Sequence, residues 1–110
     1  MTKREAETVI RGIIEKHGFI PEDNMRNALP GVERTGESAV SFNITERTDF
    51  TNCDAEHRTV KAWVEASASI CRMGGSPSAE ELLDAADQIR RGAELVAELQ
   101  QMAITYTIEF

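Results

Sequence analysis

The sequence predicts an α+β fold: a two-layer sandwich in which two helices cover one face of a small mixed three-stranded sheet, in the order α-β-β-α-β. Two spacings of apolar residues along the chain support this prediction. Apolar residues recur at steps of three and four over residues 3–17 and 78–102, which is the period of one helical face. They alternate with polar residues, as in strands buried on one face, over 38–47, 58–72 and 103–109. The length of 110 residues predicts a single domain over 1–110.

The first helix has clear start and stop signals. Thr2 and Glu5 form a capping box, in which side chains satisfy the free backbone groups at a helix start. Gly18 stands where a left-handed residue ends a helix. Between them lies an apolar stripe of Ala6, Val9, Ile10, Ile13 and Ile14.

The pattern after this helix is weaker. Pro21 suits the first position of a short helix that would carry Met25, Ala28 and Leu29, because proline lacks a backbone N–H and has a fixed φ. Pro30 and Gly31 would end that helix. Residues 31–37 have the composition of a connection.

The segment 58–72 is open to two interpretations. Apolar and polar residues alternate without a break from Val60 to Ile70, which predicts a strand. Val60, Trp63, Val64 and Cys71 would also share one helical face. The strand is favoured because Ser67 interrupts the helical stripe, whereas the alternation is unbroken.

The long second helix is the best-defined element. Ser78 and Glu81 form a second capping box, and at about 1.5 Å per residue the helix is about 36 Å long. Gly92 costs about 1 kcal/mol relative to alanine within a helix, which indicates a close approach to a neighbouring backbone. The apolar stripe consists of Leu82, Ala86, Ile89, Ala93, Val96, Leu99 and Ala103.

The strand at 103–109 follows this helix, with Ile104, Tyr106 and Ile108 on one side. The segments 58–72, 78–102 and 103–109 therefore predict a right-handed β-α-β unit with parallel strands. The strand at 38–47 would be antiparallel to both.

Charge and composition exclude several classes of protein. A net charge of −7 and a pI near 4.8 argue against a broad nucleic-acid-binding or anionic-membrane-binding surface. The sequence has neither an apolar run of about 20 residues nor the apolar core of a signal peptide, so we expect a cytoplasmic protein that does not bind membranes. Cys53 and Cys71 are then expected to be free thiols.

The densest group of reactive side chains is Cys53, Asp54, Glu56 and His57. All four are metal-ligand types, but a structural zinc site needs two or more Cys/His pairs at defined spacing. We therefore expect a polar hairpin loop, with no metal, cofactor or catalytic residue. The sequence also lacks a Ser–His–Asp order, a paired-carboxylate motif and a phosphate-binding loop. An enzyme or metal protein that uses these four residues is the least favoured class.

Two surfaces are candidates for contact with another protein. Trp63 is expected to face away from the apolar row of its strand, with Cys71 and Met73 on the same face. That face could meet a partner or a second copy of the chain, or be covered within the monomer. The second surface is an acidic stripe on the long helix, which is either solvated or a docking surface for a basic partner: Glu80, Asp84, Asp87, Glu94 and Glu98.

These observations favour a small acidic non-enzymatic protein-interaction module, such as an adaptor or inhibitor. The alternative is a homo-oligomeric structural or accessory protein, for which a homodimer is plausible. The expected partner is therefore a protein or a second copy of the chain.

Overall fold

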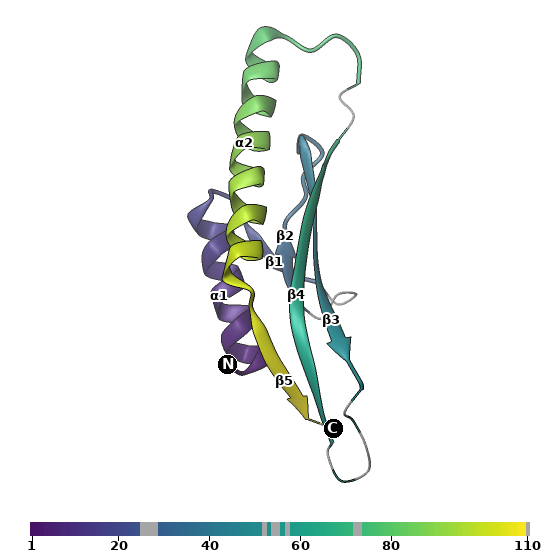
Figure 1. Ribbon diagram of the computed structural model, residues 1–110. Coiled ribbons are helices and arrows are strands. Elements are labelled where there is room, and N and C mark those ends of the chain that lie inside the picture. The colour runs from purple at the N-terminus through teal and green to yellow at the C-terminus, as the bar shows by residue number, and fades with distance from the viewer. Residues whose placement is uncertain (25–28, 52, 54–55, 57, 72–73, 110) are drawn as a thin grey trace.

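The computed structural model describes residues 1–24, 29–51, 53, 56, 58–71 and 74–109 (Figure 1). Within these residues the chain forms two helices and five strands in the order α-β-β-β-β-α-β, so the α+β class is confirmed. The helices are α1 (Lys3–Lys16) and α2 (Ala79–Met102). The strands are β1 (Pro21–Asp23), β2 (Pro30–Val32), β3 (Val40–Asp49), β4 (Thr59–Ile70) and β5 (Thr105–Glu109).

Both helices begin as the capping boxes predict. The Thr2 hydroxyl accepts a hydrogen bond from the backbone N–H of Glu5 at 3.1 Å, and the Ser78 hydroxyl accepts one from that of Glu81 at 3.1 Å. Gly18, with a φ of 82°, follows the end of α1. These caps fix where each helix starts and how α1 ends.

The prediction of a short helix at Pro21 is wrong. Pro21–Asp23 is strand β1, and it pairs antiparallel with Pro30–Val32, which is strand β2. A proline is also compatible with the first residue of a strand, because it need not donate to the ladder there. Leu29 is buried in the core, while Met25 and Ala28 lie outside the described residues.

The strand interpretation of 58–72 is confirmed. Over its whole length β3 pairs antiparallel with β4, from Val40 opposite Ile70 to Asp49 opposite Lys61. The alternation places Val60, Ala62 and Ala66 in the core. The helical alternative for this segment is therefore excluded.

The predicted parallel β-α-β unit is wrong, and so is the mixed sheet. The strand order is β3-β4-β5, and β5 runs antiparallel to β4, with Thr59 opposite Glu109 and Trp63 opposite Thr105. A parallel crossover needs a second reversal of the chain after the helix. Only Ala103, which is left-handed (φ 46°, ψ 53°), and Ile104 separate α2 from β5. After them β5 continues in the direction of the helix, without a second reversal (Figure 1).

The buried side of α2 coincides with the predicted stripe only in part, at Leu99. Its buried residues are Ala85, Gly92, Leu95 and Leu99. Of the predicted stripe, Ile89 and Val96 are half-buried, whereas Leu82, Ala86 and Ala93 are exposed. The apolar sector of α2 is thus wider than the surface that β3, β4 and α1 cover.

The close approach predicted at Gly92 exists, but it is to side chains. A Cβ at this position would lie 3.0 Å from the Phe42 ring and 3.3 Å from Val40 Cγ1, both on β3. Phe42 also meets Phe19 edge to face at 5.0 Å, and the Arg91 guanidinium lies 4.7 Å from the centre of the Phe19 ring. These contacts fix α2 against β3 and against the chain that follows α1.

The molecule is elongated. It measures 60 × 23 × 20 Å with a radius of gyration of 16.5 Å, compared with about 13 Å for a compact domain of about 100 residues. In Figure 1, α1 lies beside only the C-terminal half of α2, and the other half of α2 extends beyond it, beside the start of β3 and the end of β4. None of the helices formed by the described residues is long and apolar enough to cross a membrane.

Candidate protein-interaction site

The three-stranded sheet has two unlike faces. Even-numbered residues of β4, such as Val60 and Ala62, are buried on the face toward the helices. Odd-numbered residues lie on the other face, here called the outer face, and Trp63 is among them. Its side chain is 36% exposed, and its neighbours in the register are Arg47 on β3 and Thr105 on β5. The structure thus places Trp63 where the alternation predicts it.

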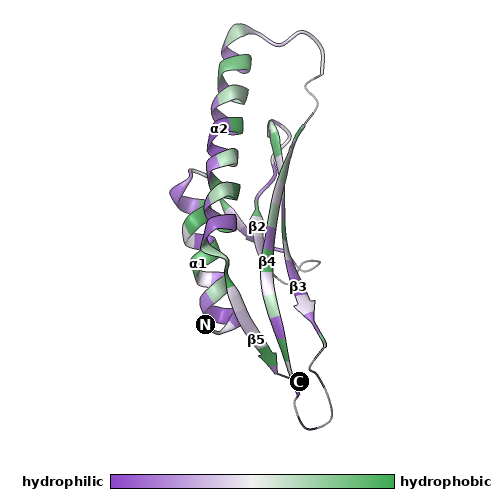
Figure 2. Cartoon of the chain, viewed as in Figure 1, coloured by the Kyte–Doolittle hydropathy of each residue, from purple (hydrophilic) through white to green (hydrophobic). Residues whose placement is uncertain are grey.

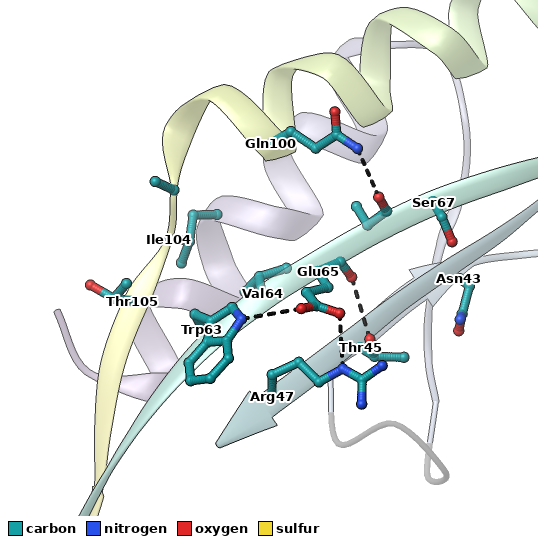
Figure 3. Close-up of a pocket in the computed structure, with 12 residues that line it drawn as sticks. Asn43, Thr45, Arg47, Trp63, Val64, Glu65, Ser67, Gln100, Ile104 and Thr105 are labelled. Carbon is teal, nitrogen blue, oxygen red and sulfur yellow. Dashed lines mark hydrogen bonds and ion pairs between the residues drawn. The ribbon is translucent and has the colours of Figure 1, made fainter. Parts of the chain in front are cut away.

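Trp63 borders a hollow of about 610 Å³, here called the Trp63 hollow (Figure 3). Asn43, Thr45 and Arg47 of β3 line it together with Glu65 and Ser67 of β4. Its other side is formed where α2 passes into β5, by residues that include Gln100, Ile104 and Thr105. The hollow therefore joins the outer face to the edge of the sheet.

Hydrogen bonds join three side chains of the hollow: Trp63, Glu65 and Arg47. The Trp63 indole N–H donates to Glu65 Oε1 at 3.3 Å, and Arg47 Nε donates to Glu65 Oε2 at 2.9 Å (Figure 3). The bond from Arg47, and then that from Trp63, lowers the pKa of Glu65 below its usual value. Glu65 is therefore ionised at neutral pH and balances the charge of Arg47.

Sequence reasoning found Trp63 but missed the rest of this hollow. Asn43, Thr45 and Arg47 come from another strand, and only the β3–β4 register brings them to Trp63. The alternation of the strand at 38–47 gave their face, but not which residue of 58–72 lies opposite each of them. The α2–β5 side depends on the antiparallel orientation of β5, which was predicted wrongly.

Cys71 is not brought to Trp63. Cys71 lies eight positions after Trp63 along extended chain, about 26 Å at 3.3 Å per residue. The Cys71 thiol accepts a hydrogen bond from Arg34 at 3.5 Å and lines a separate hollow with Asp84 and Gln88. Met73 lies outside the described residues.

The acidic stripe lies on one flank of α2, and most of its carboxylates are paired within the chain. Asp87 accepts hydrogen bonds from Arg90 at 2.9 Å and Arg91 at 2.8 Å, and Arg90 also pairs with Glu94 at 3.2 Å. The bonds from Arg91, and then from Arg90, lower the pKa of Asp87. Charges that are already paired attract a basic partner less strongly.

Glu98, at the end of the stripe, joins α2 to α1. It accepts hydrogen bonds from Lys16 at 2.8 Å and from His17 Nε2 at 3.1 Å. At the start of the stripe, Asp84 accepts a hydrogen bond from Gln88 at 2.9 Å, and Glu80 is exposed. Three of the five acids thus form an ion pair inside the chain: Asp87, Glu94 and Glu98. The docking role of the stripe stays a prediction.

Replacing Glu98 should change how stability depends on pH. The bonds from Lys16, and then from His17, lower the pKa of Glu98 in the folded state. A lowered folded pKa gives stability that is present above the unfolded pKa of about 4.3 and is lost as the pH falls through the folded value. Urea unfolding of Glu98→Gln should therefore lose less stability than wild type between about pH 5 and pH 3. Glu80→Gln, an exposed acid on the same helix, is the control; equal pH profiles for wild type and Glu98→Gln would contradict this assignment.

The described residues contain no group of three or more His, Cys, Asp and Glu side chains that could hold a metal. Asp54 and His57 of the predicted polar loop lie outside the described part of the chain, so that prediction stays open. The side chains that line the Trp63 hollow supply an aromatic surface, hydrogen-bonding groups and one ion pair. These groups are suited to binding another molecule through apolar contacts and hydrogen bonds.

Comparison of this chain with protein family models, curated proteins and solved structures gave no match.

Proposed function

We propose that this protein is a small non-enzymatic interaction module, an adaptor or inhibitor, which binds a protein partner through the outer face of its sheet at the Trp63 hollow. One observation supports this above the others: the chain's only tryptophan is 36% exposed beside a hollow that also contains an arginine. Tryptophan and arginine are the residues that most often dominate the energy of protein interfaces.

The chemistry of the outer face suggests the kind of partner. Its charged residues are of both signs, with Arg47 bonded to Glu65 and Asp49 opposite Lys61 in the register. Serine, threonine and asparagine occupy much of the remainder. A protein surface with an apolar group for Trp63 and polar groups around it fits this face, whereas nucleic acid and anionic membranes would need a basic one. We place the module in the cytoplasm, without a cofactor.

Affinity capture from a native lysate tests the proposal, with Trp63→Ala and Ile20→Ala as matched variants. Ile20 is also an exposed apolar residue, but it lies between α1 and β1. We expect at least one protein that wild type and Ile20→Ala retain equally and that Trp63→Ala loses, because truncating a central interface residue costs about 2 kcal/mol or more. A captured set that does not depend on Trp63 would contradict the proposal.

The salt dependence of binding separates the Trp63 hollow from the acidic stripe. If the stripe docks on a basic partner, the association rate should fall steeply as salt is added, because the Debye length is about 10 Å at 0.1 M. Binding through the mixed-charge outer face should show an association rate that changes little with salt. A steep salt dependence would favour the stripe instead.

A further inference from the structure

One edge of β4 is uncovered over half its length. The backbone N–H of Cys71 donates to Ala39 on the β3 side, and that of Val64 donates to Ile104 on the opposite side. Because backbone groups of successive residues point alternately to the two sides of a strand, the N–H and C=O groups of Ala66, Ala68 and Ile70 point away from β3. Within the described residues, no strand pairs with this side of β4 beyond Trp63. The Ala66 carbonyl is bonded there by the Gln100 side chain at 3.1 Å.

An apolar groove of about 320 Å³ runs between this edge and α2, and is here called the edge groove. Ala68 and Ile70 line it from β4, and Ile89, Ala93 and Val96 line it from α2. Ile70 is 70% exposed, and Leu82, on the same flank of α2, is 51% exposed. Figure 2 shows that hydrophobic residues continue along α2 into the half that extends beyond α1. A strand edge that has no neighbouring strand and lies beside an apolar surface is a template for strand addition.

We propose that the uncovered edge of β4 pairs antiparallel with the same edge of a second copy of this chain. The two sheets then join in the order β3-β4-β4-β3, and the two α2 helices lie side by side across the two-fold axis. The axis passes near Ser67 and Ala68 of each β4 and near Ala93 of each α2. Each copy thereby covers the edge groove of the other.

Three observations favour a second copy as the occupant. A strand edge is self-complementary under a two-fold axis, since each outward N–H meets an outward C=O of the other copy. Ala86, Ala93 and Ala97 are small and exposed on this flank, so two helices can approach closely across it. Only the C-terminal half of α2 lies beside α1 (Figure 1); the other half packs on Val40 through Ala85 but leaves Leu82 and Ala86 exposed, and a second copy would cover them.

Charge also selects this side of the molecule. Two chains of net charge −7 repel each other, and the acidic stripe lies on the opposite flank of α2, toward α1. The flank of α2 beside the edge groove consists of uncharged residues: Leu82, Ala86, Ile89, Ala93, Ala97 and Gln100. It is therefore the side on which two copies meet with the least repulsion.

Mass measurement by light scattering at micromolar concentration tests the proposal. We expect wild type to have twice its chain mass of 12.2 kDa. Ala93→Glu should weaken the dimer about a hundred-fold or more, because two carboxylates would be buried at the axis. In a monomer the new side chain is exposed and lies one helical turn from Arg90, so the fold should be kept. Gln101→Glu adds the same charge on the solvent side of α2 and should leave the dimer intact.

Ala68→Pro tests the edge itself. It removes an N–H that points toward the second copy and not toward β3, so circular dichroism should show a folded chain while light scattering shows a monomer. A monomeric wild type would overturn the proposal, as would a dimer that both Ala93→Glu and Ala68→Pro leave intact. Trp63 itself lies in the part of β4 that pairs with β5, so Trp63→Ala should stay dimeric, whereas Ser67 and Gln100, at the other side of the Trp63 hollow, lie at the proposed dimer contact. Loss of partner binding in a Trp63→Ala protein that is still dimeric therefore separates the two proposals.

Discussion

We expect Leu95→Ala to lower the free energy of unfolding by about 2–5 kcal/mol. Leu95 is fully buried, and it belongs to the core cluster that also contains Ile10, Ile14 and Tyr106. Truncating a buried leucine loses the free energy gained when its apolar atoms left water on folding. It also leaves a cavity that the neighbouring side chains fill only in part. Because Leu95 of α2 is buried in a cluster with residues of α1 and of the three-stranded sheet, little backbone movement is available to close that cavity.

Leu83→Ala is the matched control, since it makes the same chemical change on the same helix. Leu83 is 72% exposed, so its truncation should change stability by less than about 0.5 kcal/mol. Urea unfolding of both variants gives the comparison. Equal losses, or a larger loss at Leu83, would mean that α2 is rotated on the sheet relative to the structure described.

The second large effect is expected at Gly92. Gly92→Leu should lower stability by about 1–3 kcal/mol, because a Cβ alone would lie 3.0 Å from the Phe42 ring and 3.3 Å from Val40 Cγ1, and the rest of the side chain would overpack this contact. A gain in helix propensity of up to about 1 kcal/mol offsets only part of this cost. Thermal unfolding, or a urea midpoint, measures the net result.

Gly12→Leu, the same substitution on α1, is expected to raise stability. Gly12 is exposed within α1, and a Cβ built there meets no atom within 4 Å. The substitution should therefore raise stability by up to about 1 kcal/mol through helix propensity alone. If both substitutions stabilised the protein, Phe42 would not be packed against Gly92.

Local signals in the sequence predicted most of the secondary structure. The capping boxes at Thr2 and Ser78 fixed both helix starts, and the alternation from Val60 to Ile70 identified β4 against a helical alternative. These features depend on residues close together in the chain. The α+β class follows from them.

Features that depend on distant contacts were predicted poorly. The orientation of β5 is set by its pairing with β4, and the left-handed residue between α2 and β5 is Ala103, an alanine that carries no sequence signal for that conformation. The buried side of α2 could not be chosen because both Leu82 and Leu95 lie in its broad apolar sector, and only the positions of β3 and α1 distinguish them. The partners of Trp63 across the sheet likewise follow from register, which a single strand pattern does not specify.

The most direct test of the proposed function is the fluorescence of Trp63 during titration with a purified captured partner. It is the chain's only tryptophan, so with a partner that has no tryptophan the indole emission reports on the hollow. We expect a blue shift that saturates with the binding curve in wild type and equally in Ile20→Ala, because the partner removes water from the indole. Emission that stays unchanged while calorimetry records binding would show that the partner binds elsewhere, and the Trp63 hollow would not be the interaction site.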